Sequence, residues 1–399
     1  MALVLAENEG RVESLVPIRM ARMSSSAFAF YRGAAGLMAS DLLATPQIGA
    51  DIQICGDAHL ANFGVFASPE RALVFDLNDF DETDLGPWEW DVKRLVTSAV
   101  IAGRDRGFTD AQCRRAALAG AQSYRQWTHG FARQPTLDVW YDRVDAKAAV
   151  AMLRSLDAKT LHRGVRRTRS RTSDLMLHKL TDTDGPTPRI VDQPPLIEHV
   201  DIDLTELSGL YDGYRASLPE DRRALLDQFR VVDFARKVVG VGSVGTRCFI
   251  ALLLDDSGAP LFLQIKEASP SVVAGLGRGR PTDHDGRRVV SGQRHMQAVS
   301  DVFLGWTASN ERHGYVRQLA DMKGGVDLET VTPKVLEEYL GACGWALARA
   351  HARSGQASVV SGYLGGGDVF DCAVVDFACA YADQNAADHA RFREAVAAR

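Results

Sequence analysis

Three polar residues whose types suit phosphoryl transfer lie close together in the N-terminal quarter of the sequence. Asp57 and Asn62 are five residues apart, and Asp79 follows after a short apolar segment. In phosphotransferases one carboxylate orients the acceptor hydroxyl and takes its proton, while an amide oxygen and a second carboxylate hold Mg²⁺ against the nucleotide phosphates. The spacing therefore predicts Asp57 as the catalytic base and Asn62 and Asp79 as metal ligands, with Asp81 as a further ligand or a substrate contact.

An alternative interpretation is structural, because Asp, His and Asn often lie in loops where they cap turns and helices. In this chain, however, several such groups crowd between apolar segments: Asp57, His59, Asn62, Asp79, Asp81 and Glu82. Burying so many polar groups is unfavourable unless they bind something. The set therefore indicates a functional site. Within it, we expect His59 to shape the catalytic loop by hydrogen bonding rather than to transfer protons.

A glycine-rich run with the pattern G-x-G-x-x-G begins at Gly240. The pattern alone is weak evidence, and its commonest alternative is a dinucleotide-binding turn, which requires a helix directly after the glycines. Here the following residues are β-branched and apolar, so a hairpin is expected, and the next strand ends at Lys266. Kinases cover and anchor ATP phosphates with such a hairpin and lysine, although a lysine at a strand end can also simply reach solvent. The predicted nucleotide contacts are Gly240, Gly242, Ser243, Gly245 and Lys266.

The chain also resembles known families. Residues 56–62 resemble the H-G-D-x-H-x-x-N loop of aminoglycoside and choline phosphotransferases, which have a protein-kinase-like fold, and residues 78–91 resemble their metal loop and following helix. More closely, nearly the whole chain resembles the bacterial family DUF2252. The stretches that carry this resemblance are residues 30–35, 56–64, 75–82, 292–294 and 315–319.

The kinase-like resemblance implies ATP and Mg²⁺ as cofactors. It also predicts Arg317 as a nucleotide contact and Asp91 as a support for the catalytic loop. Kinases pair the phosphate-binding lysine with a glutamate from a nearby helix, but the helical segment after Lys266 has no acid in that place. Asp301, Gln293 or Glu267 is expected to substitute, or else Lys266 is oriented differently.

The order of the motifs differs from that of ordinary kinases, because the catalytic and metal loops precede the glycine-rich hairpin. Since an active site is a spatial arrangement, a circular permutation could retain it. The expected fold is therefore α+β, two-lobed and kinase-like, and circularly permuted. Residues 1–225 would form the catalytic and metal loops with a helical lobe, residues 226–325 a smaller β-rich nucleotide lobe, and residues 326–399 closing helices of the helical lobe. Residues 240–245 and Lys266 must then fold over Asp79.

The composition fits a globular enzyme. The 399 residues are 46% hydrophobic and 24% charged, and the net charge of −5 gives no reason to expect nucleic-acid binding. No apolar run is long enough for a membrane span, and the six cysteines lack C-x-x-C spacing. We expect a cytoplasmic protein with reduced thiols.

Hydrophobic periodicity and turn residues place the secondary structure. The expected helices are residues 24–43, 88–104, 110–131, 137–156, 204–229, 289–305, 333–352 and 371–398. The expected strands are residues 51–55, 71–75 and 315–319, with a β-rich region over 231–265 and a hairpin within 186–195. The arginine-rich residues 159–179 are expected to form a solvated face or mobile loop, or alternatively a lid that contacts phosphates or an acidic substrate.

The function expected from these features is ATP- and Mg²⁺-dependent phosphoryl transfer to a hydroxyl group, most simply that of a small molecule, with a protein side chain as another possible acceptor. Two alternatives stay open: a pseudokinase-like module that binds nucleotide without turnover, and a metal-dependent hydrolase using Asp57, His59, Asp79 and Asp81. Asp57 and Asp79 are expected to face an open cleft, so that replacing either would change stability little.

Overall fold

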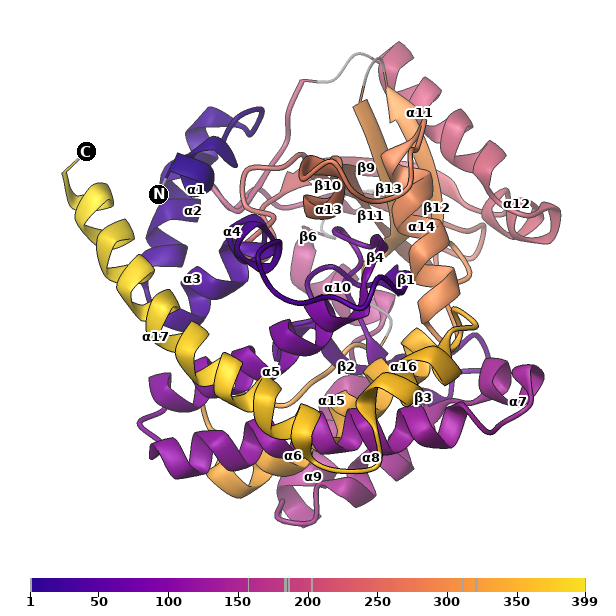
Figure 1. Cartoon of the computed structure of the whole chain (residues 1–399). Helices are drawn as coiled ribbons and strands as arrows, with labels where there is room; N and C mark the ends of the chain where they lie inside the picture. The colour runs from indigo at the N-terminus through magenta and orange to yellow at the C-terminus, as the bar shows by residue number, and fades with distance from the viewer. Residues whose placement is uncertain are drawn as a thin grey trace.

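The computed structural model describes residues 2–156, 158–182, 185, 187–201, 204–309, 312–319 and 322–398. Helices and antiparallel strands combine in an α+β fold, with a six-stranded sheet on one side and a group of long helices on the other (Figure 1). Both chain ends lie on the same side of the molecule (Figure 1). There, apolar residues from the first and last helices share one core cluster, which includes Val4 and Phe392.

Four short helices precede the catalytic loop: α1 (Ala2–Ala6), α2 (Val16–Ser24), α3 (Ala27–Gly33) and α4 (Ala35–Leu42), with a 3₁₀ turn (Glu13–Leu15) before α2. The single helix expected over residues 24–43 is therefore wrong. The helix breaks at Ala34, whose φ of −123° and ψ of 45° are not helical. The N-cap of α3 is Ser26, whose hydroxyl accepts a hydrogen bond from the backbone N–H of Ala29.

Two pairs of strands surround the predicted catalytic residues. Strand β1 (Asp51–Ile54) pairs antiparallel with β4 (Asp84–Pro87). Strand β2 (Phe63–Ala67) forms a hairpin with β3 (Leu73–Leu77), which also pairs with the short β5 (Val144–Asp145). A 3₁₀ turn (Leu60–Asn62) leads into β2. The strand expected just before the metal loop is thus confirmed.

The long helices form the main apolar core: α5 (Trp88–Asp105), α6 (Asp110–Phe131), α15 (Pro333–Ala352), α16 (Ala357–Leu364) and α17 (Val369–Ala397). The expected helices over 88–104, 110–131 and 333–352 are confirmed. The helix expected over 137–156 is wrong, because the chain there forms α7 (Thr136–Tyr141), then β5, then α8 (Ala146–Met152). Asp145 ends β5 and caps α8 by accepting a hydrogen bond from Ala148 N–H.

The six-stranded sheet is antiparallel, in the order β12-β13-β11-β10-β9-β8. Its strands are β8 (Ile197–Glu198), β9 (Arg230–Lys237), β10 (Cys248–Leu254), β11 (Pro260–Ala268), β12 (Gly305–Ser309) and β13 (Arg312–Gln318). Helices α11 (Leu204–Ser217) and α12 (Glu220–Leu226) share an apolar cluster with one set of sheet residues, and α10 (Ser173–Leu180) shares another. Helices α13 (Val272–Gly275) and α14 (Asp285–Met296) connect β11 to β12.

The arginine-rich segment is not a loop, because it forms α9 (Ala158–Arg169) and α10, and α10 packs against the sheet. The expected solvated face is confirmed, since Arg163, Arg166, Arg167 and Arg169 are exposed. Two further expectations differ from the structure. In the proline-rich segment, β7 (Arg189–Ile190) pairs with β6 (Thr181–Asp182), and β8 pairs with β9. Within the described residues, the hairpin expected inside 186–195 is therefore replaced by pairing with strands outside that segment. Helix α14 ends at Met296, well before residue 305, where β12 begins.

A buried ion pair connects three segments of the chain. Arg349 of α15 donates through Nη2 to both carboxylate oxygens of Asp76 in β3, at 2.7 Å, and to the carbonyl oxygen of Met296 at 2.8 Å. The Arg349 and Asp76 side chains are 0% and 1% exposed. The pair therefore links β3, α14 and α15 with no competition from solvent.

We expect Arg349→Met to lower the free energy of unfolding by about 3–5 kcal/mol, because it leaves the Asp76 carboxylate buried without a counter-ion. Arg114→Met is the matched control, since the Arg114 and Asp376 side chains of that pair are 47% and 66% exposed. Losing such a surface pair should cost less than about 1 kcal/mol. Urea unfolding followed by circular dichroism measures both, and equal losses in the two variants would contradict the prediction.

Candidate active site

The loop between β1 and β2 is held from below by Asp91 near the start of α5. Its carboxylate accepts hydrogen bonds from the backbone N–H groups of Cys55 and Gly56, at 2.7 and 2.9 Å, and from His351 Nε2 at 3.1 Å. Gly56 has a φ of +79°, and a Cβ there would lie 2.1 Å from the carbonyl oxygen of Glu82, so this position requires glycine. The expected support of the loop by Asp91 is confirmed.

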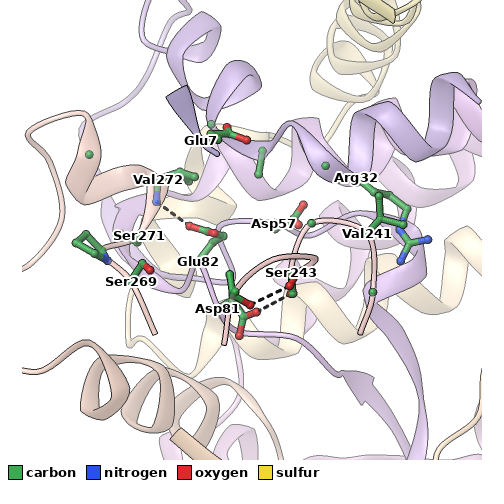
Figure 2. Close-up of a pocket in the computed structure, with 18 of the residues that line it drawn as sticks. Glu7, Arg32, Asp57, Asp81, Glu82, Val241, Ser243, Ser269, Ser271 and Val272 are labelled. Carbon is green, nitrogen blue, oxygen red and sulfur yellow. Dashed lines mark hydrogen bonds between the residues drawn. The ribbon is translucent and has the colours of Figure 1, made fainter. Parts of the chain in front are cut away.

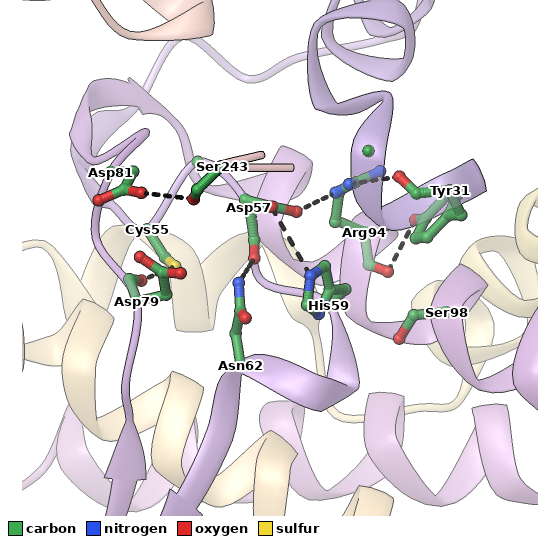
Figure 3. A network of polar contacts seen from close by, with 12 residues as sticks. Tyr31, Cys55, Asp57, His59, Asn62, Asp79, Asp81, Arg94, Ser98 and Ser243 are labelled. Carbon is green, nitrogen blue, oxygen red and sulfur yellow. Dashed lines mark hydrogen bonds and ion pairs between the residues drawn. The ribbon is translucent and has the colours of Figure 1, made fainter. Parts of the chain in front are cut away.

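The Asp57 carboxylate is ion-paired with a buried arginine (Figure 3). Arg94 of α5 donates from Nε to Asp57 Oδ1 at 2.7 Å, and its Nη2 donates to the carbonyl oxygen of Tyr31 at 2.9 Å. Burial disfavours the charged carboxylate, but Arg94 outweighs this effect and lowers the pKa of Asp57 below its usual value. Asp57 is 20% exposed, so it is less open to solvent and more firmly paired than the sequence suggested.

His59 lies behind Asp57 in the same loop. Its Nε2 is 3.7 Å from Asp57 Oδ2, and its side chain is 4% exposed. Burial lowers the pKa of His59 to about 3, so the ring is neutral at physiological pH. The ring forms no hydrogen bond among the described residues, because Nδ1 is buried without a partner and Nε2 is too far from Asp57, so the expected hydrogen bonding of His59 is not seen.

The β2–β3 hairpin brings Asn62 and Asp79 to the same end. Phe63 is paired with Leu77, and the N–H of Asn78 donates to the carbonyl oxygen of Asn62 at 2.8 Å. Asn62 Nδ2 donates to the backbone carbonyl of Asp57 at 2.8 Å (Figure 3). The predicted base and the two predicted metal ligands therefore meet at one hairpin end, as the spacing indicated.

Asp81 is the acidic partner of Lys266. Its Oδ2 accepts a hydrogen bond from Lys266 Nζ at 2.5 Å, and its Oδ1 accepts one from the Tyr315 hydroxyl at 2.6 Å. Lys266 and Tyr315 are cross-strand neighbours on β11 and β13, so their side chains emerge on the same face of the sheet. Burial opposes ionisation of Asp81, but Lys266 outweighs it and lowers the pKa of this carboxyl.

The partners suggested from the sequence for Lys266 are therefore wrong. Glu267 pairs with Arg247, Gln293 donates to Gln297, and Asp301 accepts from the backbone N–H of Phe303. Lys266 instead lies 3.8 Å from Asp79 Oδ1, in addition to its contact with Asp81. Residues 185 positions apart in the sequence thus form one charged cluster.

Asp79 is the acid in this cluster that fits a cation best. Its Oδ1 is buried and has no hydrogen-bond partner among the described residues, although the side chain as a whole is 35% exposed. Burial and the neighbouring charge of Asp81 raise the pKa of Asp79. Because Asn62 Nδ2 is occupied by Asp57, Oδ1 is the atom that Asn62 offers to a metal. Within the described chain no three His, Cys, Asp or Glu side chains form a metal cluster.

The glycine-rich run forms a hairpin loop between β9 and β10, as expected, and no helix follows it, unlike a dinucleotide-binding turn. Gly240 and Gly245 have φ values of +66° and +89°. The N-terminal segment holds the loop from outside: Arg11 Nη1 donates to the carbonyl oxygens of Gly242 and Val244, at 2.8 and 2.7 Å. On the inner side, Ser243 Oγ donates to Asp81 Oδ2 at 3.3 Å (Figure 2).

These elements enclose a cavity of about 570 Å³. Its walls come from the glycine-rich loop, the catalytic and metal loops, the four N-terminal helices and α13 (Figure 2). The predicted site residues that line it are Asp57, His59, Asn62, Asp79, Asp81, Gly240, Gly242 and Ser243. The others do not: Lys266 lies behind Asp81, Gly245 packs against the Arg11 side chain, and Arg317 lines a small neighbouring cavity, where it donates to the carbonyl oxygen of Asn78 at 3.0 Å.

Several contributors were missed at the sequence level. Arg94 lies one turn after Asp91 in α5, but Glu89 and Lys93 of the same helix are also charged, so the sequence did not single it out. Tyr315 lies in a stretch shared with the resembled family, but nothing in the sequence indicated its contact with Asp81. Arg11 is more than 200 residues from the loop that it holds, so its role depends on the tertiary fold alone.

Comparison with protein families agrees with the resemblance read from the motifs. The family model described as "Uncharacterized protein conserved in bacteria (DUF2252)" matches residues 11–395. The chain belongs to the DUF2252 family. Neither the comparison with curated proteins nor that with solved structures gives a match. The charged cluster of this DUF2252 member therefore has to be interpreted from its own geometry.

Membrane insertion was not expected from the composition. Among the helices in the described part of the chain, none combines the length and apolar character that crossing a bilayer requires.

Proposed function

We propose that this protein is an ATP- and Mg²⁺-dependent phosphotransferase that acts on a hydroxyl group of a small molecule. One observation carries the proposal. Lys266 is ion-paired with Asp79 and Asp81, and Ser243 donates to Asp81. Both acids line the cavity that Asp57 also lines. A glycine-rich loop, a buried lysine, a candidate metal ligand and a carboxylate base are the parts that phosphoryl transfer requires. No membrane or nucleic-acid partner is part of the proposal.

We further propose that the fold is kinase-like and circularly permuted, with a helical lobe and a smaller β-rich lobe. The support is the order of parts in the β-rich region: a glycine-rich loop between two antiparallel strands, then Lys266 on the next strand, then α14. Protein kinases have their lysine on the third strand and a helix after it. In this chain those parts follow the catalytic loop in sequence, and the two chain ends pack together in one apolar cluster, as a permutation would allow.

In this proposal the backbone N–H groups of Gly240 and Gly242 and the Ser243 hydroxyl face the nucleotide phosphates. Gly245 does not line the cavity and instead packs against the Arg11 side chain. Lys266 neutralises part of the phosphate charge, exchanging its contact with Asp81 for one with a phosphate oxygen. Arg317, which the sequence suggested as a nucleotide contact, is not part of the proposal, because it lines the small neighbouring cavity and donates to the carbonyl oxygen of Asn78. Asn62 and Asp79 would hold Mg²⁺, with Asp81 as a possible additional ligand. When bound, Mg²⁺ neutralises charge on the phosphates.

Asp57 would accept a hydrogen bond from the acceptor hydroxyl and take its proton. With its pKa lowered by Arg94, Asp57 is a weak base, so orienting the hydroxyl is the larger part of its task. This suits a loose transition state, in which the proton is transferred late. His59 stays neutral and keeps the loop in shape.

The two alternatives make different demands on the same residues. A metal-dependent hydrolase would use His59 as a ligand or base, but its Nε2 faces Asp57 and the ring is enclosed. It would also leave the clamped glycine-rich loop without a role. A pseudokinase would bind Mg·ATP without turnover, and only measurement distinguishes it from an active enzyme.

The test of this function is a thermal-shift titration with ATP, ADP and GTP, each with and without Mg²⁺. Ligand that binds only the native state stabilises it by about 2.7 kcal/mol at 100 times the dissociation constant. We expect ATP to raise the melting temperature clearly in the presence of Mg²⁺ and little in EDTA. Lys266→Met should abolish the shift. An unchanged melting temperature with every nucleotide would reject the proposed function.

A further inference from the structure

Arg32 is a conspicuous cavity residue that the proposed mechanism does not use. It lies in the last turn of α3. Its side chain lines the cavity beside Val241 of the glycine-rich loop (Figure 2). A Cβ on Gly242 would be 3.3 Å from the Arg32 carbonyl oxygen, so the backbone of Arg32 also lies against this loop.

The other arginines of the cavity have protein partners. Arg11 donates to three backbone carbonyl groups, including that of Gly242. Arg19 donates to the Glu7 carboxylate at 2.9 Å and to two further oxygens. Nε of Arg19 and Nε of Arg32 are both buried without a hydrogen-bond partner. Arg32 differs in that, within the described chain, its guanidinium forms no hydrogen bond or ion pair at all. Its recorded contact is a distant one with an aromatic ring, 6.0 Å from Cζ to the ring centroid.

The acids of the cavity do not require Arg32 as a counter-ion. The paired acids and their partners are Glu7 with Arg19, Asp57 with Arg94, Asp81 with Lys266 and Glu267 with Arg247. Glu82 accepts a hydrogen bond from the N–H of Val272 at 2.8 Å, and burial raises its pKa to about 7. Asp79 retains an unpartnered oxygen, which fits a metal ion. Asp79 also shares the Lys266 ammonium with Asp81, at 3.8 Å. None of these acids is therefore paired with Arg32.

The backbone next to Arg32 is held by neighbouring residues. Arg19 donates to the carbonyl oxygen of Gly33 at 2.8 Å, and a Cβ on Gly33 would lie 2.7 Å from the sulfur of Met23. Burial lowers the pKa of Arg32, and the charges of Asp57 and Asp79 oppose this shift, so both acids act on it electrostatically. A planar guanidinium with free donors is suited to binding carboxylate or phosphate through two parallel hydrogen bonds.

We propose that Arg32 binds an oxyanion of a ligand, a phosphate or carboxylate group, in the part of the cavity next to the glycine-rich loop. The oxyanion has two possible sources, the terminal phosphate of the donor nucleotide and an anionic group on the acceptor. The choice between these sources rests on the proposed function, whereas the binding of an oxyanion by Arg32 does not.

The test is isothermal titration of wild-type protein, Arg32→Gln, Arg32→Lys and the control Arg247→Gln. Arg247 is a nearby cation that already pairs with Glu267, so its replacement makes the same charge change without removing an unmatched donor. Inorganic phosphate and malate are titrated in metal-free buffer. ADP and the non-hydrolysable ATP analogue AMP-PNP are titrated with Mg²⁺. Melting temperatures establish that each variant is folded. If Arg32→Gln does not fold, Arg32→Lys is used in its place.

Arg32→Gln should weaken binding of the relevant anion by about 10- to 100-fold. Arg32→Lys should weaken it less, because it keeps the charge and loses only the planar fork. Arg247→Gln should change affinity by less than about threefold. A loss for AMP-PNP but not for ADP assigns Arg32 to the terminal phosphate. A loss for phosphate or malate with both nucleotides unaffected assigns it to the acceptor.

The remaining outcomes overturn the inference or separate it from the proposed function. The inference is overturned if Arg32→Gln binds all four probes as tightly as wild type does. It is also overturned if Arg247→Gln loses as much affinity as Arg32→Gln, or if the wild-type protein binds none of the probes. If wild type binds no nucleotide but binds phosphate or malate through Arg32, the proposed function fails and the oxyanion site stands.

Discussion

Asp57→Asn is expected to lower the turnover of Mg·ATP by about 10²–10⁴-fold, while the affinity for Mg·ATP stays close to that of wild type. The range is typical for loss of a general base. Nucleotide affinity should persist because Asp57 is proposed to contact the acceptor hydroxyl and not the metal. The measurement is a coupled ADP-release assay, run with the best acceptor from a screen of hydroxyl compounds, together with isothermal titration of the nucleotide.

The choice of asparagine follows from the ion pair with Arg94. The amide oxygen of the substituted side chain would still accept a hydrogen bond from Arg94 Nε, whereas Asp57→Ala would leave a guanidinium that is 3% exposed without its partner, at a cost of about 3–5 kcal/mol. A lower melting temperature is thus expected even for Asp57→Asn, which corrects the expectation of an open cleft with little effect on stability. Wild-type turnover in a folded Asp57→Asn variant would show that Asp57 is not the base.

The parts of the site that the sequence predicted are those fixed by local chain geometry. Asp57, Asn62 and Asp79 flank one hairpin, so their spacing and the β-prone segment between them were enough to bring them to one end. The long helices α5, α6 and α15 were likewise predicted, because uninterrupted apolar periodicity marks them. At Ala34 and Asp145 the helix is broken or newly capped, although the apolar periodicity of the sequence continues across both positions. The predicted helices there were therefore too long.

The parts that could not be predicted depend on contacts between distant segments. The acid for Lys266 was sought among residues near it in the sequence, but the sheet places Tyr315 beside Lys266 and directs both toward Asp81. Similarly, nothing local to Arg11 indicates that it holds the glycine-rich loop. In both cases a hydrogen-bonding group has many possible partners in the sequence, and only tertiary packing selects one.

Asp79→Ala is expected to remove Mg²⁺-dependent nucleotide binding and turnover together. Replacing residues that merely orient metal ligands commonly costs about 10- to 100-fold in metal affinity, so loss of a ligand itself should weaken Mg·ATP binding by at least about 100-fold. Asp79 is also the acid whose Oδ1 lacks a hydrogen-bond partner among the described residues. Removing it therefore breaks no hydrogen bond of that oxygen, and the melting temperature without ligand should change little.

Asp81→Asn provides the contrast, because Asp81 is the close partner of Lys266 and Tyr315. That variant should lose stability without ligand, since it weakens a buried charge pair, whereas Asp79→Ala should lose the Mg²⁺ dependence. Titration of ATP into both variants, with Mg²⁺ and with EDTA, separates the two roles. If Asp79→Ala binds Mg·ATP like wild type and Asp81→Asn does not, the metal ligand is Asp81, and the unpartnered oxygen of Asp79 has another purpose.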